Sequence, residues 1–161
     1  MSEVIFLKVI VKSFYRSGID AEFVQDNQSL SQKGTLRGLH YQAPPFAQGK
    51  LVRVIQGKVL DVAVDLRKNS ATYGQHMTIE LSSENHHMFW VPPGFAHGFL
   101  TLEDRTIFTY KVSNVYNKSS EGGLLWNDPD LNIDWGIDPA EIILSEKDKL
   151  LPRIKDLDSP F

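Results

Sequence analysis

The chain has 161 residues, with 17 Lys and Arg against 20 Asp and Glu, and no cysteine. This length suits one domain with a single core, so we expect residues 1–161 to form a single domain. A net charge of −3 gives no general attraction for nucleic acid. The lack of cysteine excludes disulfides and thiolate-bound metals and fits a reducing compartment.

The sequence shows no sign of membrane insertion or secretion. No apolar run approaches the roughly 18 residues of a membrane span. Glu3 lies where a signal peptide needs positive charge, and no small-residue cleavage site follows. We therefore expect a soluble, cytoplasmic protein without a membrane partner.

In chain order, the first predicted element is a short helix over residues 11–18, closed by Gly18. If Leu36, Leu39 and Tyr41 then mark a strand, its inward face carries polar and ionisable side chains. Such a face either holds a ligand or belongs to a half-exposed edge strand, and spacing alone leaves both interpretations open.

The middle of the chain is rich in β-branched residues and predicts strands. Residues 51–55 and 58–65 are two such runs, and Gln56-Gly57 between them is a hairpin signal. Further strands are predicted at residues 76–81, 88–91, 94–102 and 106–112. Short strands at this spacing predict an all-β sandwich or barrel, and a jelly roll is the best match. A second short helix is predicted over residues 145–151, with Ser145 as N-cap and Asp148 as a capping acid.

The five histidines do not form a metal-binding pattern. There is no His-x-His pair, and the adjacent His86 and His87 would point to opposite faces of a strand. We therefore expect no metal site. His76, His86 and His87 are predicted to be solvated surface residues.

Other ionisable residues stand in apolar surroundings. His97 follows a Pro-Pro-Gly-Phe-Ala run and Asp61 lies inside an apolar strand, so the two can satisfy each other, for structure alone or for chemistry. Tyr110 is predicted to face inward, as a core residue or a proton donor. Arg37, Lys50 and Arg53 form a local positive excess.

Together these residues suggest acid–base chemistry without a metal. Removing a proton beside a carbonyl needs a base, a donor to the developing enolate oxygen and an acid that returns the proton. An imidazole, an ammonium and a phenol fit these three roles.

Seven segments of the chain strongly resemble the dTDP-4-dehydrorhamnose 3,5-epimerases. Three of them are Lys-Gly-Thr-Leu-Arg-Gly-Leu-His-Tyr-Gln (33–42), Gln-Gly-Lys-Leu-Val-Arg-Val (48–54) and Pro-Gly-Phe-Ala-His-Gly-Phe (93–99). The others are residues 23–27, 61–67, 120–123 and 126–129. The resemblance implies a metal-free cupin-type jelly roll without a cofactor, usually a homodimer. It also implies epimerisation of a dTDP-linked 4-keto-6-deoxyhexose at C3 and C5, on the way to dTDP-L-rhamnose.

The resemblance also implies roles for individual residues. His40 is the general base, oriented and charged by Asp148, while Lys50 stabilises the enolate and Tyr110 donates the proton from the opposite face. His97 with Asp61 is a second pair at the sugar. The remaining expected contacts, to sugar, nucleotide or diphosphate, come from Arg37, Gln25, Asn27, Tyr116 and Glu121.

One departure from the family pattern concerns the N-terminal region. Members usually carry an Asp-x-Arg-Gly-x-Phe segment that reaches the nucleotide, and residues 3–8 contain no such motif. This departure leaves a non-catalytic sugar-nucleotide binder as an alternative. A mono-epimerase of antibiotic-sugar type is a second, although Tyr110 favours double epimerisation, and a metal cupin is the third, least favoured by the missing His-x-His.

Overall fold

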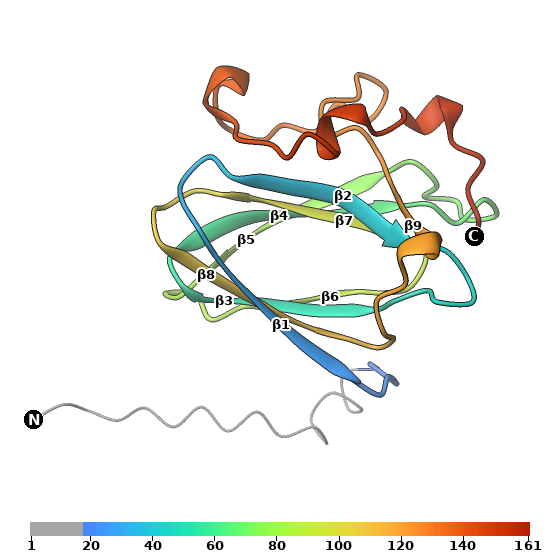
Figure 1. Cartoon of the computed structure of the whole chain (residues 1–161), viewed down its shortest axis with the longest axis horizontal. Coiled ribbons are helices and arrows are strands. Elements are labelled where there is room, and N and C mark those ends of the chain that lie inside the picture. Colours follow the sequence, from blue (N-terminus) through green and yellow to red (C-terminus); the bar gives the residue numbers. More distant parts are fainter. Residues whose placement is uncertain (1–17) are drawn as a thin grey trace, which may run out of the picture.

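The computed structural model describes residues 18–161, which form two antiparallel sheets packed face to face (Figure 1). The four-stranded sheet has the order β1 (Gln25–Ser31), β8 (Thr106–Val112), β3 (Lys50–Gln56) and β6 (Met88–Val91). The five-stranded sheet has the order β5 (His76–Ser82), β4 (Lys58–Asp65), β7 (Phe95–Thr101), β2 (Leu36–Gln42) and β9 (Glu121–Gly123). The predicted all-β class is confirmed.

The strands predicted from β-branched runs agree with the structure to within one residue at each end. The strands without a prediction are β1 and β9, which are the outer strands of their sheets. β1 carries a single large apolar residue, Leu30, and β9 is only three residues long. Short, polar edge strands lack the apolar alternation on which sequence prediction depends.

The predicted hairpin at Gln56-Gly57 is wrong, because β3 and β4 belong to different sheets. Gly57 has a φ of +79°, which suits a corner between sheets as well as a hairpin turn. Local turn chemistry therefore located the bend but not the partner of either strand.

The predicted terminal helices fare differently. Most of residues 11–18 lies outside the described part of the chain. Residues 145–151 form only one 3-10 turn, η3 (Asp148–Leu150), because Pro152 holds Leu151 in an extended conformation with ψ of 149°. The other short turns are η1 (Lys118–Ser120), η2 (Pro139–Glu141) and η4 (Ile154–Asp156).

Two apolar clusters stabilise the sandwich. One lies between the sheets, where the Phe99 and Phe108 rings stack with centroids 4.1 Å apart. The other lies on the outer face of the five-stranded sheet, where Leu36 and Leu39 pack with Trp135 and Ile154 of the C-terminal region. Residues beyond β9 thus cover this sheet (Figure 1).

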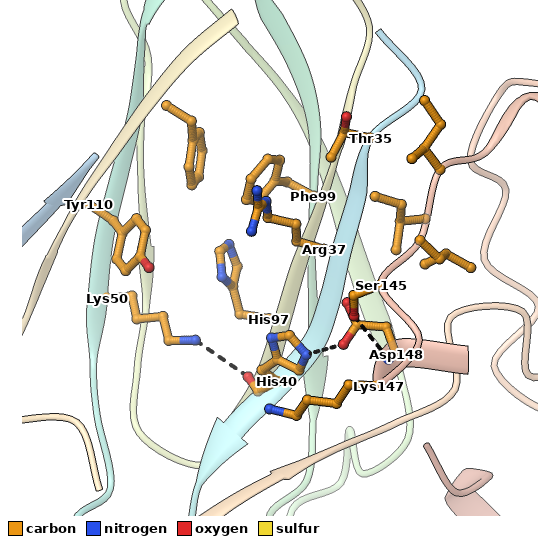
Figure 2. A pocket seen from close by; sticks show the side chains of 14 residues that line it. Thr35, Arg37, His40, Lys50, His97, Phe99, Tyr110, Ser145, Lys147 and Asp148 are labelled. Carbon is orange, nitrogen blue, oxygen red and sulfur yellow. Dashed lines mark hydrogen bonds and ion pairs between the residues drawn. The ribbon is translucent and has the colours of Figure 1, made fainter. Parts of the chain in front are cut away.

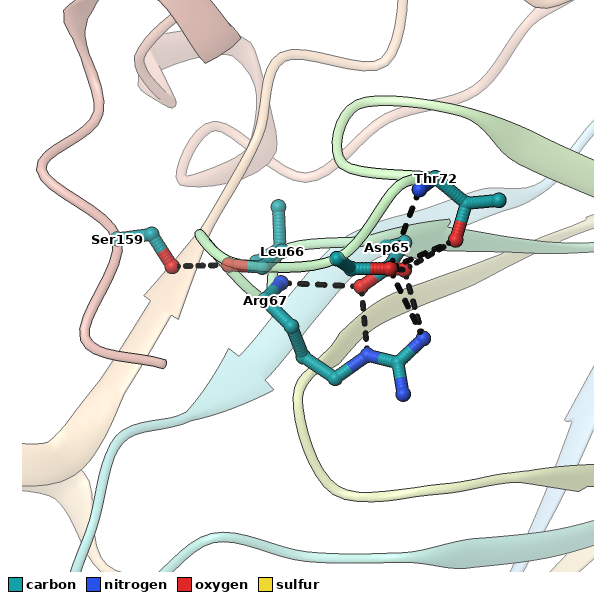
Figure 3. Close-up of polar contacts among 6 residues, drawn as sticks. Asp65, Leu66, Arg67, Thr72 and Ser159 are labelled. Atoms are coloured by element: carbon teal, nitrogen blue, oxygen red, sulfur yellow. Dashed lines mark hydrogen bonds and ion pairs between the residues drawn. The ribbon is translucent and has the colours of Figure 1, made fainter.

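The chain end is tied to the loop between β4 and β5 (Figure 3). Asp65 accepts hydrogen bonds from the backbone and guanidinium of Arg67 and from the hydroxyl of Thr72. Next to it, the Ser159 hydroxyl donates to the Leu66 carbonyl at 2.5 Å. This network fixes the C-terminal tail against the sheet edge.

Within residues 18–161, no helix is both long enough and apolar enough to cross a membrane.

Candidate active site

A cavity of about 400 Å³ opens between the two sheets. Side chains from both sheets and from the segment before η3 line it, and Figure 2 shows ten of them with labels. The lining residues are Thr35, Leu36, Arg37, His40, Lys50, His97, Phe99, Phe108, Tyr110, Ile143, Leu144, Ser145, Lys147 and Asp148. Six predicted site residues are therefore brought together, namely Arg37, His40, Lys50, His97, Tyr110 and Asp148.

An irregularity in β2 turns both Arg37 and His40 into the cavity. The register between β2 and β7 shifts between these two residues, so side chains three positions apart share a face. Gly38 lies within the shift with a φ of +124°, and a Cβ there would meet Gly98 Cα at 2.5 Å. Only glycine fits this close contact.

His40 is hydrogen-bonded to Asp148. The Nε2 atom of His40 lies 2.7 Å from Oδ1 of Asp148, whose Oδ2 accepts the Gly38 N–H at 3.4 Å. An ionised carboxylate can only accept, so Nε2 carries the proton and Nδ1 keeps its lone pair. Burial works to raise the pKa of Asp148, but the His40, Gly38 and Ser145 hydrogen bonds outweigh it and lower that pKa. The imidazole is thereby oriented as a base.

Lys50 and Tyr110 face His40 from the opposite sheet. The Lys50 ammonium donates to the His40 carbonyl at 3.4 Å. Burial lowers the pKa of Lys50 to about 8, against the opposing charges of Asp61 and Glu121. Burial also raises the pKa of Tyr110, although Arg37 acts in the other direction. At neutral pH the cavity thus contains a protonated amine and a protonated phenol.

His97 and Asp61 form a second, deeper pair. Nε2 of His97 lies 2.9 and 3.1 Å from the two carboxylate oxygens of Asp61, and both residues are buried. His97 lines the cavity, and Asp61, on the neighbouring strand β4, holds the His97 ring in place. The same ring stacks on Phe108 at 6.4 Å, so its orientation is fixed from two sides.

Glu121 and Tyr116 lie outside the cavity lining but connect to it. The Tyr116 hydroxyl donates to Glu121 at 2.9 Å, and Glu121 forms an ion pair with Lys147, which does line the cavity. Burial works to raise the pKa of Glu121, but the Lys147 and Tyr116 hydrogen bonds outweigh it and lower that pKa. No role was predicted for Lys147, and the only sequence feature that could have indicated one was its position next to Asp148.

Gln25 and Asn27 are not among the cavity-lining residues. The Gln25 amide donates to Asn27 at 2.8 Å on β1, where Asn27 lies opposite Tyr110 in register. Phe99 and Phe108 also line the cavity, and no prediction placed them there, because apolar strand residues are expected in the core of any sandwich.

The remaining histidines lie at the surface. His76, His86 and His87 are exposed, as predicted. Within residues 18–161, no group of three or more His, Asp or Glu side chains is placed to hold a metal ion.

Comparison with known proteins bears on this cavity. The family model described as dTDP-4-dehydrorhamnose 3,5-epimerase matches residues 7–156, which is nearly the whole chain. The chain belongs to this family. The predicted resemblance, the cupin-type jelly roll and the isomerase class are thereby confirmed.

Individual members of the epimerase family are closely similar. The dTDP-4-dehydrorhamnose 3,5-epimerase of Shigella flexneri is 53% identical over 131 residues, which cover 81% of this chain and 71% of the relative. A 3,5-epimerase structure from Legionella pneumophila, in complex with dTDP-4-keto-L-rhamnose, matches with a TM-score of 0.90 at 45% identity over 95% of this chain and 81% of that one.

A more distant member has a narrower activity. The structure of a 3'-monoepimerase from Streptomyces bikiniensis, in complex with dTDP-quinovose, matches with a TM-score of 0.83 at 30% identity over 91% of this chain and 74% of that one. The chain is thus more similar to the two 3,5-epimerases than to this mono-epimerase.

Proposed function

We propose that this epimerase inverts C3 and C5 of dTDP-4-dehydro-6-deoxy-D-glucose and yields dTDP-4-dehydro-L-rhamnose, a precursor of dTDP-L-rhamnose. The observation that carries the proposal is that His40 and Tyr110 line one cavity from opposing sheets. Inversion at carbon needs a base on one side of the sugar ring and an acid on the other. The similarity to 3,5-epimerases supports the choice of substrate.

His40 acts as the base in this mechanism. The C4 carbonyl acidifies the C–H bonds at C3 and C5, and Nδ1 of His40 takes one proton while the bonding electrons move to O4. Asp148, at 2.7 Å from Nε2, stabilises the resulting imidazolium and keeps the ring oriented. Once the ring turns its other centre to His40, the same groups serve C5.

Lys50 stabilises the negative charge on O4. Its ammonium lies on the wall opposite His40 in a buried setting, where a charge-assisted hydrogen bond is stronger than in water. The enolate is therefore lower in energy than it would be in solution.

Tyr110 returns the proton from the other ring face. The phenol O–H protonates the carbon, and the C4 carbonyl forms again. The phenolate then takes a proton from solvent, and the His40 imidazolium releases its proton to solvent. Because burial raises the pKa of Tyr110, the group holds its proton until the enolate requires it.

The proposed binding roles rest on the family resemblance. The His97–Asp61 pair lies at the cavity wall and serves as a sugar contact, and Arg37 contacts sugar or diphosphate. We assign the nucleotide and diphosphate to the outer residues Gln25, Asn27, Tyr116 and Glu121, none of which lines the cavity. The cytoplasmic location stays a prediction.

We also propose a homodimer, formed through the outer face of the four-stranded sheet. A groove of about 790 Å³ crosses this face, and Leu51, Ile55 and Met88 line it. Residues 21–23 also line this groove, and Ile55 within it is 43% exposed, whereas residues beyond β9 cover the other sheet. A second copy of the chain is the occupant that would remove this apolar surface from water.

Solvent exchange tests the reaction. The protein is incubated with dTDP-4-dehydro-6-deoxy-D-glucose in heavy water, and deuterium is located by NMR. We expect label at C3 and C5. Label at one centre would indicate a mono-epimerase, and binding without any label would indicate a non-catalytic binder.

A further inference from the structure

The carboxylate that orients His40 belongs to a very short secondary-structure element. Asp148 begins η3, a single 3-10 turn of three residues, and not a helix that could hold it by continued hydrogen bonding. It is nevertheless 97% buried, with its oxygens on His40 and the Gly38 N–H. Something outside η3 must therefore fix the backbone at this point.

Ser145 makes the contacts that fix it. The Asp148 N–H donates to both the hydroxyl and the carbonyl oxygen of Ser145, each at 3.1 Å. The Lys149 N–H donates to the same carbonyl at 3.4 Å. The bond from the Asp148 N–H to the Ser145 hydroxyl is the one expected of the predicted N-cap. The predicted capping role of the Asp148 side chain is wrong, because its carboxylate bonds to His40 and Gly38, and the residue before η3 is Lys147.

Backbone pairing in the rest of the segment does not reach Asp148. It is anchored at Ile143, whose backbone pairs with Gly34 and Leu36, and at Pro152, which accepts from Leu125. Between these anchors, the backbone-to-backbone hydrogen bonds of residues 144–151 all lie within the turn itself. Besides its own contacts with β2, Asp148 is therefore held by the Ser145 bonds to its backbone, next to side-chain anchors at Leu144, which packs against the core, and at Lys147, which pairs with Glu121.

We propose that Ser145 is a positioning residue: its hydroxyl holds the turn that places the Asp148 carboxylate against His40. The consequence for catalysis rests on the proposed epimerisation. Ser145 itself need not touch the reacting atoms, because it acts through Asp148. A displaced carboxylate would leave the imidazole without its fixed orientation and its counter-charge.

A readout without substrate tests the positioning itself. The Nε2 proton of His40, held by Asp148 at 2.7 Å, should give a downfield NMR resonance in the free protein, assigned by its loss in His40→Asn. We expect Ser145→Ala to move this resonance upfield or broaden it by exchange with water. Ser145→Thr, which keeps the hydroxyl, should restore it.

The kinetic readout separates positioning from binding. With Ser145→Ala we expect kcat to fall roughly 2- to 30-fold, the range that loss of a helix cap corresponds to, while KM stays within about a factor of two. Ser82→Ala is the matched control. The Ser82 hydroxyl accepts the N–H of Asn85 at 3.0 Å, with the same spacing of three residues, and Ser82 does not line the cavity.

The outcomes are distinguishable. If Ser145→Ala keeps both the resonance and kcat, or if Ser82→Ala loses as much kcat, the positioning role is refuted. If the wild-type protein exchanges no deuterium but the His40 resonance responds to Ser145→Ala, the proposed function fails while the placement of Asp148 by Ser145 stands.

Discussion

His40 and Tyr110 divide the proton transfer between the two sheets of the sandwich. His40 lies on β2 of the five-stranded sheet and Tyr110 on β8 of the four-stranded one. A proton removed by one and returned by the other must cross from one ring face to the opposite face. This division predicts different results for removing each group.

Replacing His40 by Asn should greatly slow proton removal. Because the amide cannot act as a base, we expect deuterium incorporation at C3 and C5 to fall by about 10²- to 10⁴-fold. The measurement is the NMR rate of label uptake in heavy water. Near-normal uptake would refute the assignment of the base.

Replacing Tyr110 by Phe should instead uncouple exchange from inversion. The variant keeps the ring but loses the O–H that delivers the proton, so His40 can still remove a proton and return deuterium to the same face. We expect label in recovered substrate with little epimerised product. Full inversion by Tyr110→Phe would show that another group, or solvent, is the acid.

Lys50 predicts the alkaline limb of the pH profile. Its ammonium is the form that stabilises O4, and burial lowers its pKa to about 8, so this form disappears as the pH rises through that value. We therefore expect kcat to decline above about pH 8. Lys50→Arg, whose side chain stays charged throughout this range, should be slower but should lack this decline. The same decline in both proteins would assign it to another group.

At the scale of elements, a single charged residue, Asp65, stabilises the loop after β4. Asp65 is buried at the strand end, and Arg67, which stacks over Phe95 at 4.7 Å, completes its hydrogen bonding with Ser70 and Thr72. The hydrogen bonds from Arg67 do most to lower the pKa of Asp65, and burial works against them. The loop is therefore held by one carboxylate.

Asp65→Asn should destabilise the fold. We expect a loss of about 2–4 kcal/mol at pH 7, since an amide cannot accept all the charge-assisted hydrogen bonds that the carboxylate accepts. Urea unfolding at equilibrium measures it. Asp158→Asn, which removes an exposed ion pair with Lys68, is the control and should leave the midpoint unchanged.

The same carboxylate contributes to acid sensitivity. Because the folded pKa of Asp65 lies below its unfolded value near 3.9, its stabilisation is complete above that value and is lost as the pH falls toward the folded pKa. The stability difference between wild type and Asp65→Asn should therefore shrink on acidification below about pH 4. A difference that stays constant down to pH 2 would contradict this account.

At the scale of the whole molecule, the two outer sheet faces are unequal. The five-stranded sheet is covered by the chain's own C-terminal region, whereas the groove on the four-stranded sheet leaves Ile55 43% exposed. Apolar side chains gathered in an open groove are typical of a protein interface. This asymmetry is what supports the proposed homodimer.

Ile55→Lys should weaken that dimer. We expect light scattering to give twice the 18.3 kDa chain mass for the wild type, and the variant to dissociate at a concentration at least about tenfold higher. Met77→Lys, at an exposed apolar residue of β5 outside the groove, should not change the assembly. A monomeric wild-type protein, or equal effects of both changes, would overturn the proposed interface.

The sequence by itself determined the all-β class, the ends of most strands, the family and the residues around His40. These depend on local alternation and on contiguous motifs, which a linear sequence contains. The polar edge strands β1 and β9 were not predicted, because they show little alternation of apolar and polar residues. No local signal could show that β3 and β4 pair in different sheets.

Sequence spacing could not show which side chains meet, and the family resemblance alone predicted that His40 pairs with Asp148. The tertiary structure places the Asp148 carboxylate 2.7 Å from His40 across 108 positions of sequence, and it turns Lys147 toward Glu121. It also ends the predicted helix at a single turn, so that Ser145 caps a turn that presents Asp148 to His40. Such contacts depend on how strands from two sheets and a C-terminal segment pack together, and sequence spacing does not encode that packing.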